Sequence, residues 1–155
     1  PAVVPAERRR RKDIDMGIMD HLHPELQDRF SNGGGELAQK MGIEYLELGA
    51  ERSVARMPVE GNRQVVGILH GGAHVVLGES LGSLSAAIHA GPGRYAVGID
   101  VNATHTKSVA DGWVTATCTA ISLGRTICVH EIAITDDSGD RLSTVRITNL
   151  LRDQS

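Results

Sequence analysis

The sequence predicts an α+β domain in which an antiparallel β-sheet wraps around one long helix. The first observation is the apolar stretch from Leu69 to Ala90, which is long enough for a single long helix. The second is that four long segments with the composition of strands follow this stretch, and the third is that two shorter ones precede it. An antiparallel sheet around a single helix accounts for that order.

The length and composition of the chain indicate one soluble domain. A chain of 155 residues buries roughly 70% of its unfolded surface without cross-links. We expect a single domain over residues 16–155 and a disordered basic tail over residues 1–15, where Arg8 to Lys12 place five positive charges in a row. That run is either a solvated terminus or a loose contact for a polyanion.

Charge and composition exclude several classes of partner. The net charge of −3 and the small number of aromatic residues argue against a nucleic-acid partner. No stretch has the pattern of a signal peptide, and no apolar run reaches the roughly 18 residues that span a membrane. Cys118 and Cys128 do not have a metal-binding or redox spacing. We therefore expect a cytoplasmic protein without a membrane partner.

The first elements are short helices. Five apolar residues have helical spacing between Met16 and Phe30, but Pro24 interrupts them, so this segment is either a kinked helix or two short pieces. The glycines of 33–35 break the chain, and a second short helix is expected over Glu36 to Met41, ending at Gly42.

The strands are expected on both sides of the long helix. Ile43 to Leu48 and Arg52 to Met57 precede it, and Pro58 ends the second of them because proline has no N–H to donate. The helix is expected over Gly71 to His89, ended by Gly91-Pro92-Gly93. The later strands are expected, in chain order, at Tyr95–Asn102, Trp113–Ser122, Thr126–Thr135 and Arg141–Leu151, with a hairpin turn over 136–140 that places Gly139 at positive φ.

The long helix is unusually thin. Gly78 and Gly82 each cost about 1 kcal/mol relative to alanine in a helix interior. Together with the small residues over 83–87 they allow another element to approach closely. Two explanations stay open for these residues: close packing against another element, or room for a ligand.

Glu79 is the only ionisable residue between His74 and His89 on this apolar helix. Removing a carboxylate from water is costly, so a carboxylate on a buried helix is usually paired or functional. Gly71 lies near the helix N-terminus, where unpaired N–H groups and the helix dipole favour a developing negative charge. The helix therefore carries a candidate acid/base and a candidate oxyanion donor.

The spacing of these two groups predicts a dimer. Glu79 lies eight residues after Gly71, about 12 Å along a helix axis, and a glutamate side chain reaches only roughly 4 Å. Two antiparallel helices from two subunits can offer Glu79 of one chain to Gly71 of the other. If both groups serve one reaction, we expect a symmetric dimer with two composite sites.

Neighbouring residues have more than one interpretation. Ser83 follows Glu79 by four residues and can bond the carboxylate, an attacking water or a backbone carbonyl. Gln64 and His70 either orient a substrate carbonyl or hold the loop before the helix. His70 and His74 raise the hypothesis of a metal site, but the HExxH spacing is absent and we expect no metal. The two cysteines lack a basic activator and are poor nucleophile candidates.

The segment Gln64…His70-Gly71-Gly72-Ala73…Glu79-Ser80-Leu81-Gly82-Ser83 resembles the hotdog-fold acyl-CoA thioesterases. The match is to the branch that contains the PaaI-like, 4-hydroxybenzoyl-CoA and 1,4-dihydroxy-2-naphthoyl-CoA thioesterases, and it covers about Leu37 to Leu151. The resemblance implies a hotdog fold and a homodimer, often paired again into a homotetramer. It also implies that Glu79 acts as base or nucleophile, that the partner's Gly71 N–H polarises the thioester carbonyl, and that Gln64, His70 and Ser83 assist.

The resemblance also implies contacts with coenzyme A. Asn102 to Ser108 is similar to a segment that contacts the CoA arm, with His105 lining the pantetheine channel. Leu123 to Thr126 resembles a turn that meets the phosphates. Lys107, Arg125 and turn N–H groups suit phosphate, and the alternative for each charge is a solvated turn residue. The expected substrate-binding set is Gly72, His105, Lys107, Ser108, Gly124, Arg125 and Thr126, with Arg152 as a weaker candidate.

The expected function is hydrolysis of an acyl-CoA thioester with an aromatic or medium-sized acyl group. The CoA thioester is then the substrate and no cofactor is needed. Two alternatives stay open. A hotdog enoyl-CoA hydratase needs an Asp/His pair near the helix, which the sequence does not offer. A non-catalytic acyl-CoA-binding domain is favoured if Glu79 is held in a structural ion pair.

Overall fold

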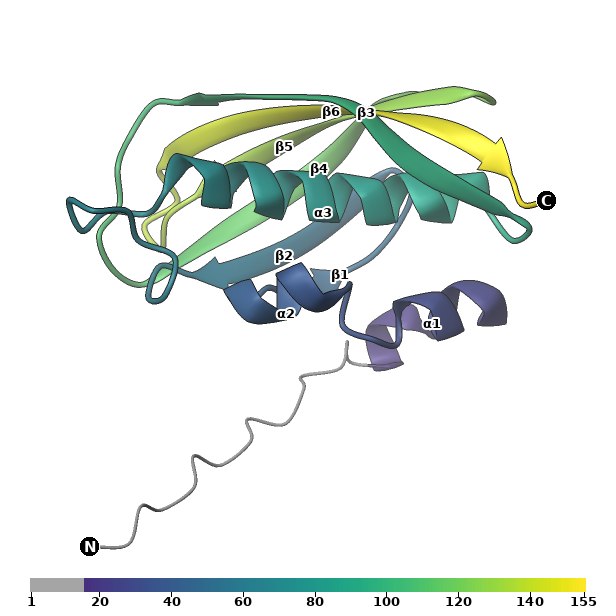
Figure 1. Ribbon diagram of the computed structural model, residues 1–155, viewed down its shortest axis with the longest axis horizontal. Coiled ribbons are helices and arrows are strands. Elements are labelled where there is room, and N and C mark those ends of the chain that lie inside the picture. Colours follow the sequence, from purple (N-terminus) through teal and green to yellow (C-terminus); the bar gives the residue numbers. More distant parts are fainter. Residues whose placement is uncertain (1–15) are drawn as a thin grey trace, which may run out of the picture.

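The structure, a computed structural model, describes residues 16–155, so the basic tail expected over residues 1–15 lies outside the described part. The long helix α3, Gly71–Ala90, lies against the inner face of a curved six-stranded sheet (Figure 1). Neighbouring strands are all antiparallel, in the order β1-β2-β4-β5-β6-β3. The expected α+β architecture is confirmed.

The strands agree with the sequence-based expectations to within a few residues. Pro58 is the last residue of β2, and Gly139 has a φ of 86° in the turn before β6, as expected. The largest difference is β3, which continues to His105 because its last residues pair with β6. The bounds are β1 Glu44–Glu47, β2 Arg52–Pro58, β3 Arg94–His105, β4 Trp113–Leu123, β5 Ile127–Thr135 and β6 Arg141–Asp153.

The segment before the sheet forms separate short helices. A 3₁₀ turn, η1 Met16–Met19, is followed by α1 Pro24–Phe30, with Pro24 in the first turn of α1, where no intrahelical N–H bond is lost. The interpretation as two short pieces is therefore correct. The helix α2, Glu36–Met41, ends at Gly42, which has a φ of 73°.

The helix α1 contacts the connection between α3 and β3. The Glu25 carboxylate accepts a hydrogen bond from the Gly93 N–H at 3.2 Å, and Arg29 Nη1 donates to the Arg94 carbonyl at 2.9 Å. Glu25 and Arg29 also form an ion pair at 2.7 Å. The N-terminal segment is thereby attached to the end of α3.

Packing accounts for the two glycines inside α3. A Cβ on Gly78 would lie 2.8 Å from Val145 Cγ1, and a Cβ on Gly82 would collide with Ile147 Cγ2. Both partners are fully buried residues of β6. Gly78 and Gly82 therefore allow the helix to approach the sheet closely. Of the two explanations for these glycines, close packing and room for a ligand, the structure supports close packing.

The strand β3 lies at one edge of the sheet. Within the described residues it pairs with β6 alone, and twelve residues of its other edge are left without a strand partner. Its exposed side chains include four apolar ones, Tyr95, Val97, Ile99 and Val101. A long edge strand with exposed apolar residues is a surface that proteins normally cover.

Candidate active site

The N-terminus of α3 presents an available N–H group. The His70 ring caps the helix by accepting the Gly72 N–H on Nδ1 at 2.8 Å. The Gly71 N–H, one of the N-terminal donors that lack an intrahelical acceptor, has no hydrogen-bond partner within residues 16–155. The His70 ring therefore serves as the helix cap, and the Gly72 N–H is already hydrogen-bonded to it. The Gly71 N–H is left as the candidate oxyanion donor.

His105 lies directly over this turn. A Cβ on Gly71 would be 2.9 Å from His105 Nε2, so a side chain at that position would displace the ring. Nδ1 of His105 is hydrogen-bonded to Ser143 Oγ at 2.9 Å, and the ring of His74 packs against the His105 ring. Three elements, α3, β3 and β6, therefore fix His105 beside the candidate oxyanion donor.

Glu79 differs from the sequence-based expectation. We expected the carboxylate to share the burial of its helix, but in the single chain Glu79 is exposed, because it projects toward the edge strand β3 and not into the core. Within the described residues it forms no ion pair or side-chain hydrogen bond. The condition that would favour a non-catalytic role is not met.

Ser83 and Gln64 have defined partners. Ser83 Oγ donates to Asn149 Oδ1 at 3.4 Å and not to Glu79. Gln64 accepts the Val66 N–H on its side chain at 3.2 Å, and its backbone closes the turn to Ile68 and Gly67. The structure places Gln64 in the loop before α3 and Ser83 one turn beyond Glu79.

The expected CoA-binding residues fall at two ends of α3. Lys107 and Ser108 follow His105 and lie at the Gly71 end, where Lys107 Nζ contacts Asp136 at 3.4 Å and also Asp140. The turn of Gly124, Arg125 and Thr126 lies at the other end, since the Gly124 carbonyl accepts a hydrogen bond from His89 of α3 at 2.8 Å. One chain separates these two groups by nearly the length of the helix.

Thiol and metal chemistry have little support in the described residues. Burial raises the pKa of the Cys118 thiol to about 11 and also raises that of Cys128, so neither is an activated nucleophile. Over residues 16–155 there is no group of three or more histidine, cysteine or acidic side chains placed to hold a metal ion. In the same range no helix is long and apolar enough to cross a membrane.

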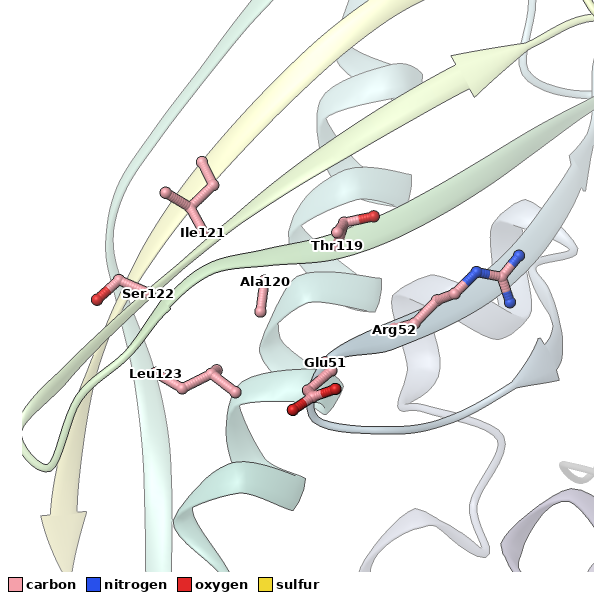
Figure 2. Close-up of a pocket in the computed structure, with 7 residues that line it drawn as sticks. All are labelled: Glu51, Arg52, Thr119, Ala120, Ile121, Ser122 and Leu123. Carbon is pink, nitrogen blue, oxygen red and sulfur yellow. The ribbon is translucent and has the colours of Figure 1, made fainter.

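An open pocket of about 400 Å³ lies away from these residues. It is formed between the loop before β2 and the end of β4 (Figure 2), and its lining contains none of the expected site residues. Its lining residues are Glu51, Arg52, Thr119, Ala120, Ile121, Ser122 and Leu123.

Sequence reasoning missed two polar residues of β6. Ser143 bonds His105 and Asn149 bonds Ser83, and both side chains are fully buried. A signal for Asn149 was present, because in the alternation of this strand it takes an inward position between Ile147 and Leu151. A polar residue at such a position is a candidate for a specific hydrogen bond.

Comparison with known proteins assigns a class to this arrangement. The proofreading thioesterase EntH of Cronobacter turicensis is 36% identical over 127 residues, which cover 81% of this chain and 93% of that protein. A relative from Deinococcus radiodurans is 44% identical over 136 residues, or 83% of this chain and 86% of its own.

Two solved structures share the fold at similar identity. A thioesterase from Haemophilus influenzae superposes with a TM-score of 0.74 at 36% identity, covering 77% of this chain and 84% of its own. A mutant thioesterase from Pseudomonas aeruginosa superposes with a TM-score of 0.78 at 34% identity, covering 86% and 98%. The fold and the site define a thioester hydrolase with a hotdog fold.

The model of the thioesterase superfamily matches residues 66–143, a range that includes Gly71, Glu79 and His105. The chain belongs to the thioesterase superfamily.

Proposed function

We propose that the chain hydrolyses acyl-CoA thioesters with an aromatic or medium-sized acyl group, as in the PaaI-like branch. The Gly71 N–H would stabilise the oxyanion, and Glu79 would act as base or nucleophile. The observation that carries the proposal is that both groups are without partners in the described chain and lie on one continuous helix. Membership of the thioesterase superfamily supports the same chemistry.

We propose that the active site is composite. Eight residues of helix separate Gly71 from Glu79 by about 12 Å, which is too far for both to reach one carbonyl. Glu79 lies beside Gly98 of β3, the strand whose free edge exposes apolar residues. Pairing of two β3 edges about a twofold axis would satisfy the unpaired backbone groups of this edge and bring Glu79 of one subunit towards Gly71 of its partner.

The same symmetry would account for the separation of the two expected CoA-binding segments. With antiparallel helices, the turn of Gly124, Arg125 and Thr126 of one subunit would lie near Lys107 and Ser108 of the other. Each CoA would then contact both chains. Association of two such dimers into a homotetramer is part of the same proposal.

In the proposed reaction the thioester carbonyl accepts a hydrogen bond from Gly71 N–H while its carbon is attacked. If Glu79 is the base, it takes a proton from water as the water oxygen bonds to that carbon. If Glu79 is the nucleophile, an anhydride forms first and water cleaves it. In both cases the C–S bond breaks and CoA leaves as the thiolate, which is protonated by solvent.

The test is a panel of aromatic and medium-chain acyl-CoA esters, with a thiol-detecting reagent that measures release of CoA. We expect Glu79→Gln and Glu79→Ala to lower kcat by about a hundredfold or more with little change in KM. Glu36→Gln, at an exposed glutamate of α2, is the matched control and should behave as the unmodified enzyme.

Full activity of both Glu79 variants would disprove the assignment. Loss of enoyl absorbance with crotonyl-CoA, without thiol release from any ester, would replace hydrolysis by hydration.

A further inference from the structure

Asn149 breaks the apolar pattern of the inner face of β6. Its side chain is fully buried between the inward-facing Ile147 and Leu151, and its Nδ2 has no hydrogen-bond partner within residues 16–155. Leaving a buried amide group unpaired is unfavourable. An apolar residue would avoid that cost, so the role of Asn149 is to be sought at its other amide atom, Oδ1.

Oδ1 of Asn149 and an oxygen of the candidate catalytic carboxylate both lie beside Gly98. A Cβ on Gly98 would lie 3.4 Å from Glu79 Oε1 and 3.8 Å from Asn149 Oδ1. Gly98 does not have a positive φ, so its backbone does not require glycine. Its missing side chain instead leaves space beside the exposed Glu79 carboxylate, and Ile147 Cδ1, at 3.6 Å from such a Cβ, also lines this space.

Oδ1 also receives the hydroxyl proton of Ser83, at 3.4 Å. A serine has one proton to donate, so this bond leaves only the lone pairs of Ser83 Oγ for other partners. Ser83 lies four residues after Glu79 on α3, where the two side chains can meet. With its proton directed to Asn149, Ser83 offers an acceptor beside Glu79.

We propose that Asn149 is a positioning residue that orients the Ser83 hydroxyl, so that Ser83 and Glu79 both accept hydrogen bonds from the hydrolytic water in the space in front of Gly98. The inference rests on the proposed function. A water held by two acceptors presents a lone pair to the thioester carbon, or to the acyl carbon of the anhydride. Without Asn149, Ser83 is free to donate to Glu79, which stabilises the carboxylate and makes it a weaker base.

The proposal predicts a specific effect on the pH profile. Asp100 on β3 and Arg146 and Arg152 on β6 lie at exposed, outward-facing register positions. The other charged residues of these strands, Arg94, Arg141 and Asp153, and also His105, lie at the strand ends. The nearest titratable groups on α3 itself are His74 and His89, five and ten residues from Glu79 along the sequence. In the proposed dimer His70 and His105 beside the partner's Gly71 would also lie near Glu79. The effect of Asn149 is therefore measured as the difference between the acidic limbs of the Asn149→Leu variant and the unmodified enzyme.

The test compares Asn149→Leu, Ser83→Ala and the double variant, with Thr148→Val as the control on the outward face of β6. We expect Asn149→Leu to lower kcat about tenfold or more, to leave KM within about threefold, and to move the acidic limb to lower pH. Because Asn149 acts through Ser83, the double variant should equal Ser83→Ala in both kcat and acidic limb.

A second variant leaves the core untouched. Gly98→Ala adds a methyl group at ordinary contact distances from Glu79 and Asn149, in the space assigned to the water. We expect it to lower kcat about tenfold or more as well.

Several outcomes would overturn the inference. It is wrong if Asn149→Leu keeps the kcat and acidic limb of the unmodified enzyme, or if the losses of the two single variants multiply in the double variant. If Asn149→Leu fails to fold, unchanged kcat in Gly98→Ala overturns the assignment of the water. Absence of thiol release by the unmodified enzyme overturns the proposed function together with this inference, whereas the other outcomes overturn the inference alone.

Discussion

The imidazole rings of His74 and His105 lie with their centroids 5.1 Å apart and their planes tilted by 32°. His74 is 3% exposed, and burial, with a smaller contribution from His105, lowers its pKa to about 4. The ordinary pKa of histidine is about 6.5. Between these values the unfolded chain binds more protons than the folded one, so the free energy of unfolding falls as the pH is lowered through this window.

We therefore expect the free energy of unfolding to be smaller at about pH 4.5 than at about pH 7, and His74→Phe to reduce this dependence. Phenylalanine keeps a ring against His105 but does not titrate. Urea unfolding at a series of pH values measures the effect. Part of the dependence should remain, because burial also lowers the pKa of His130. An unchanged pH dependence in His74→Phe would contradict the assignment.

The composite site predicts complementation between two inactive variants. Gly71→Val forces His105 away from the helix N-terminus, and Glu79→Ala removes the carboxylate. When equal amounts are unfolded together and refolded, half of the dimers are mixed, and each mixed dimer contains one intact site. We expect about one quarter of the unmodified activity per subunit. If each site lay within one chain, the mixture would stay inactive.

The packing of α3 against β6 predicts an unusual response to alanine. In an open helix Gly82→Ala would stabilise by about 1 kcal/mol. Here the added methyl group collides with Ile147, and we expect a net loss of about 1–3 kcal/mol. Denaturant unfolding measures it, and the double variant Gly82→Ala/Ile147→Ala should lose less than the sum of the single variants. A stabilised Gly82→Ala would show that the helix shifts freely.

Lys107 offers a choice between a phosphate contact and a structural ion pair. Its Nζ contacts both Asp136 and Asp140, which compete with any bound anion. If Lys107 binds CoA, Lys107→Ala should raise KM about threefold with kcat unchanged, and Asp140→Asn should lower KM because it releases the lysine. Measurements at increasing salt concentration should diminish both effects. Unchanged KM in both variants would leave Lys107 as a surface charge.

The element bounds were predictable wherever local chemistry ends an element. Gly42, Pro58 and Gly91 mark their boundaries by backbone restrictions that act within one or two residues. The end of β3 was not predictable in this way. Thr104 and His105 are held in the strand by pairing with Thr144 and Ser143, which lie about forty residues later and leave no local signal.

In the candidate site, too, features set by the local sequence were predictable, and features set by contacts with distant segments were not. Gly71 and Glu79 could be singled out as candidates because both lie on one helix and the apolar pattern around them is local. The exposure of Glu79 was missed because it depends on which side of α3 faces the sheet edge. The partner of Ser83 was missed because Asn149 is brought to it by the register of β6, sixty-six residues away along the chain.

The bonds from α1 to the connection between α3 and β3 have a consequence for local opening. The Gly93 amide is held by the carboxylate of Glu25, and Arg29 holds the neighbouring carbonyl of Arg94. Exchange of the Gly93 amide hydrogen with solvent therefore requires this bond to Glu25 to open. The connection that follows α3 is thereby coupled to a helix about sixty residues earlier, and loss of these bonds should make both segments open more readily.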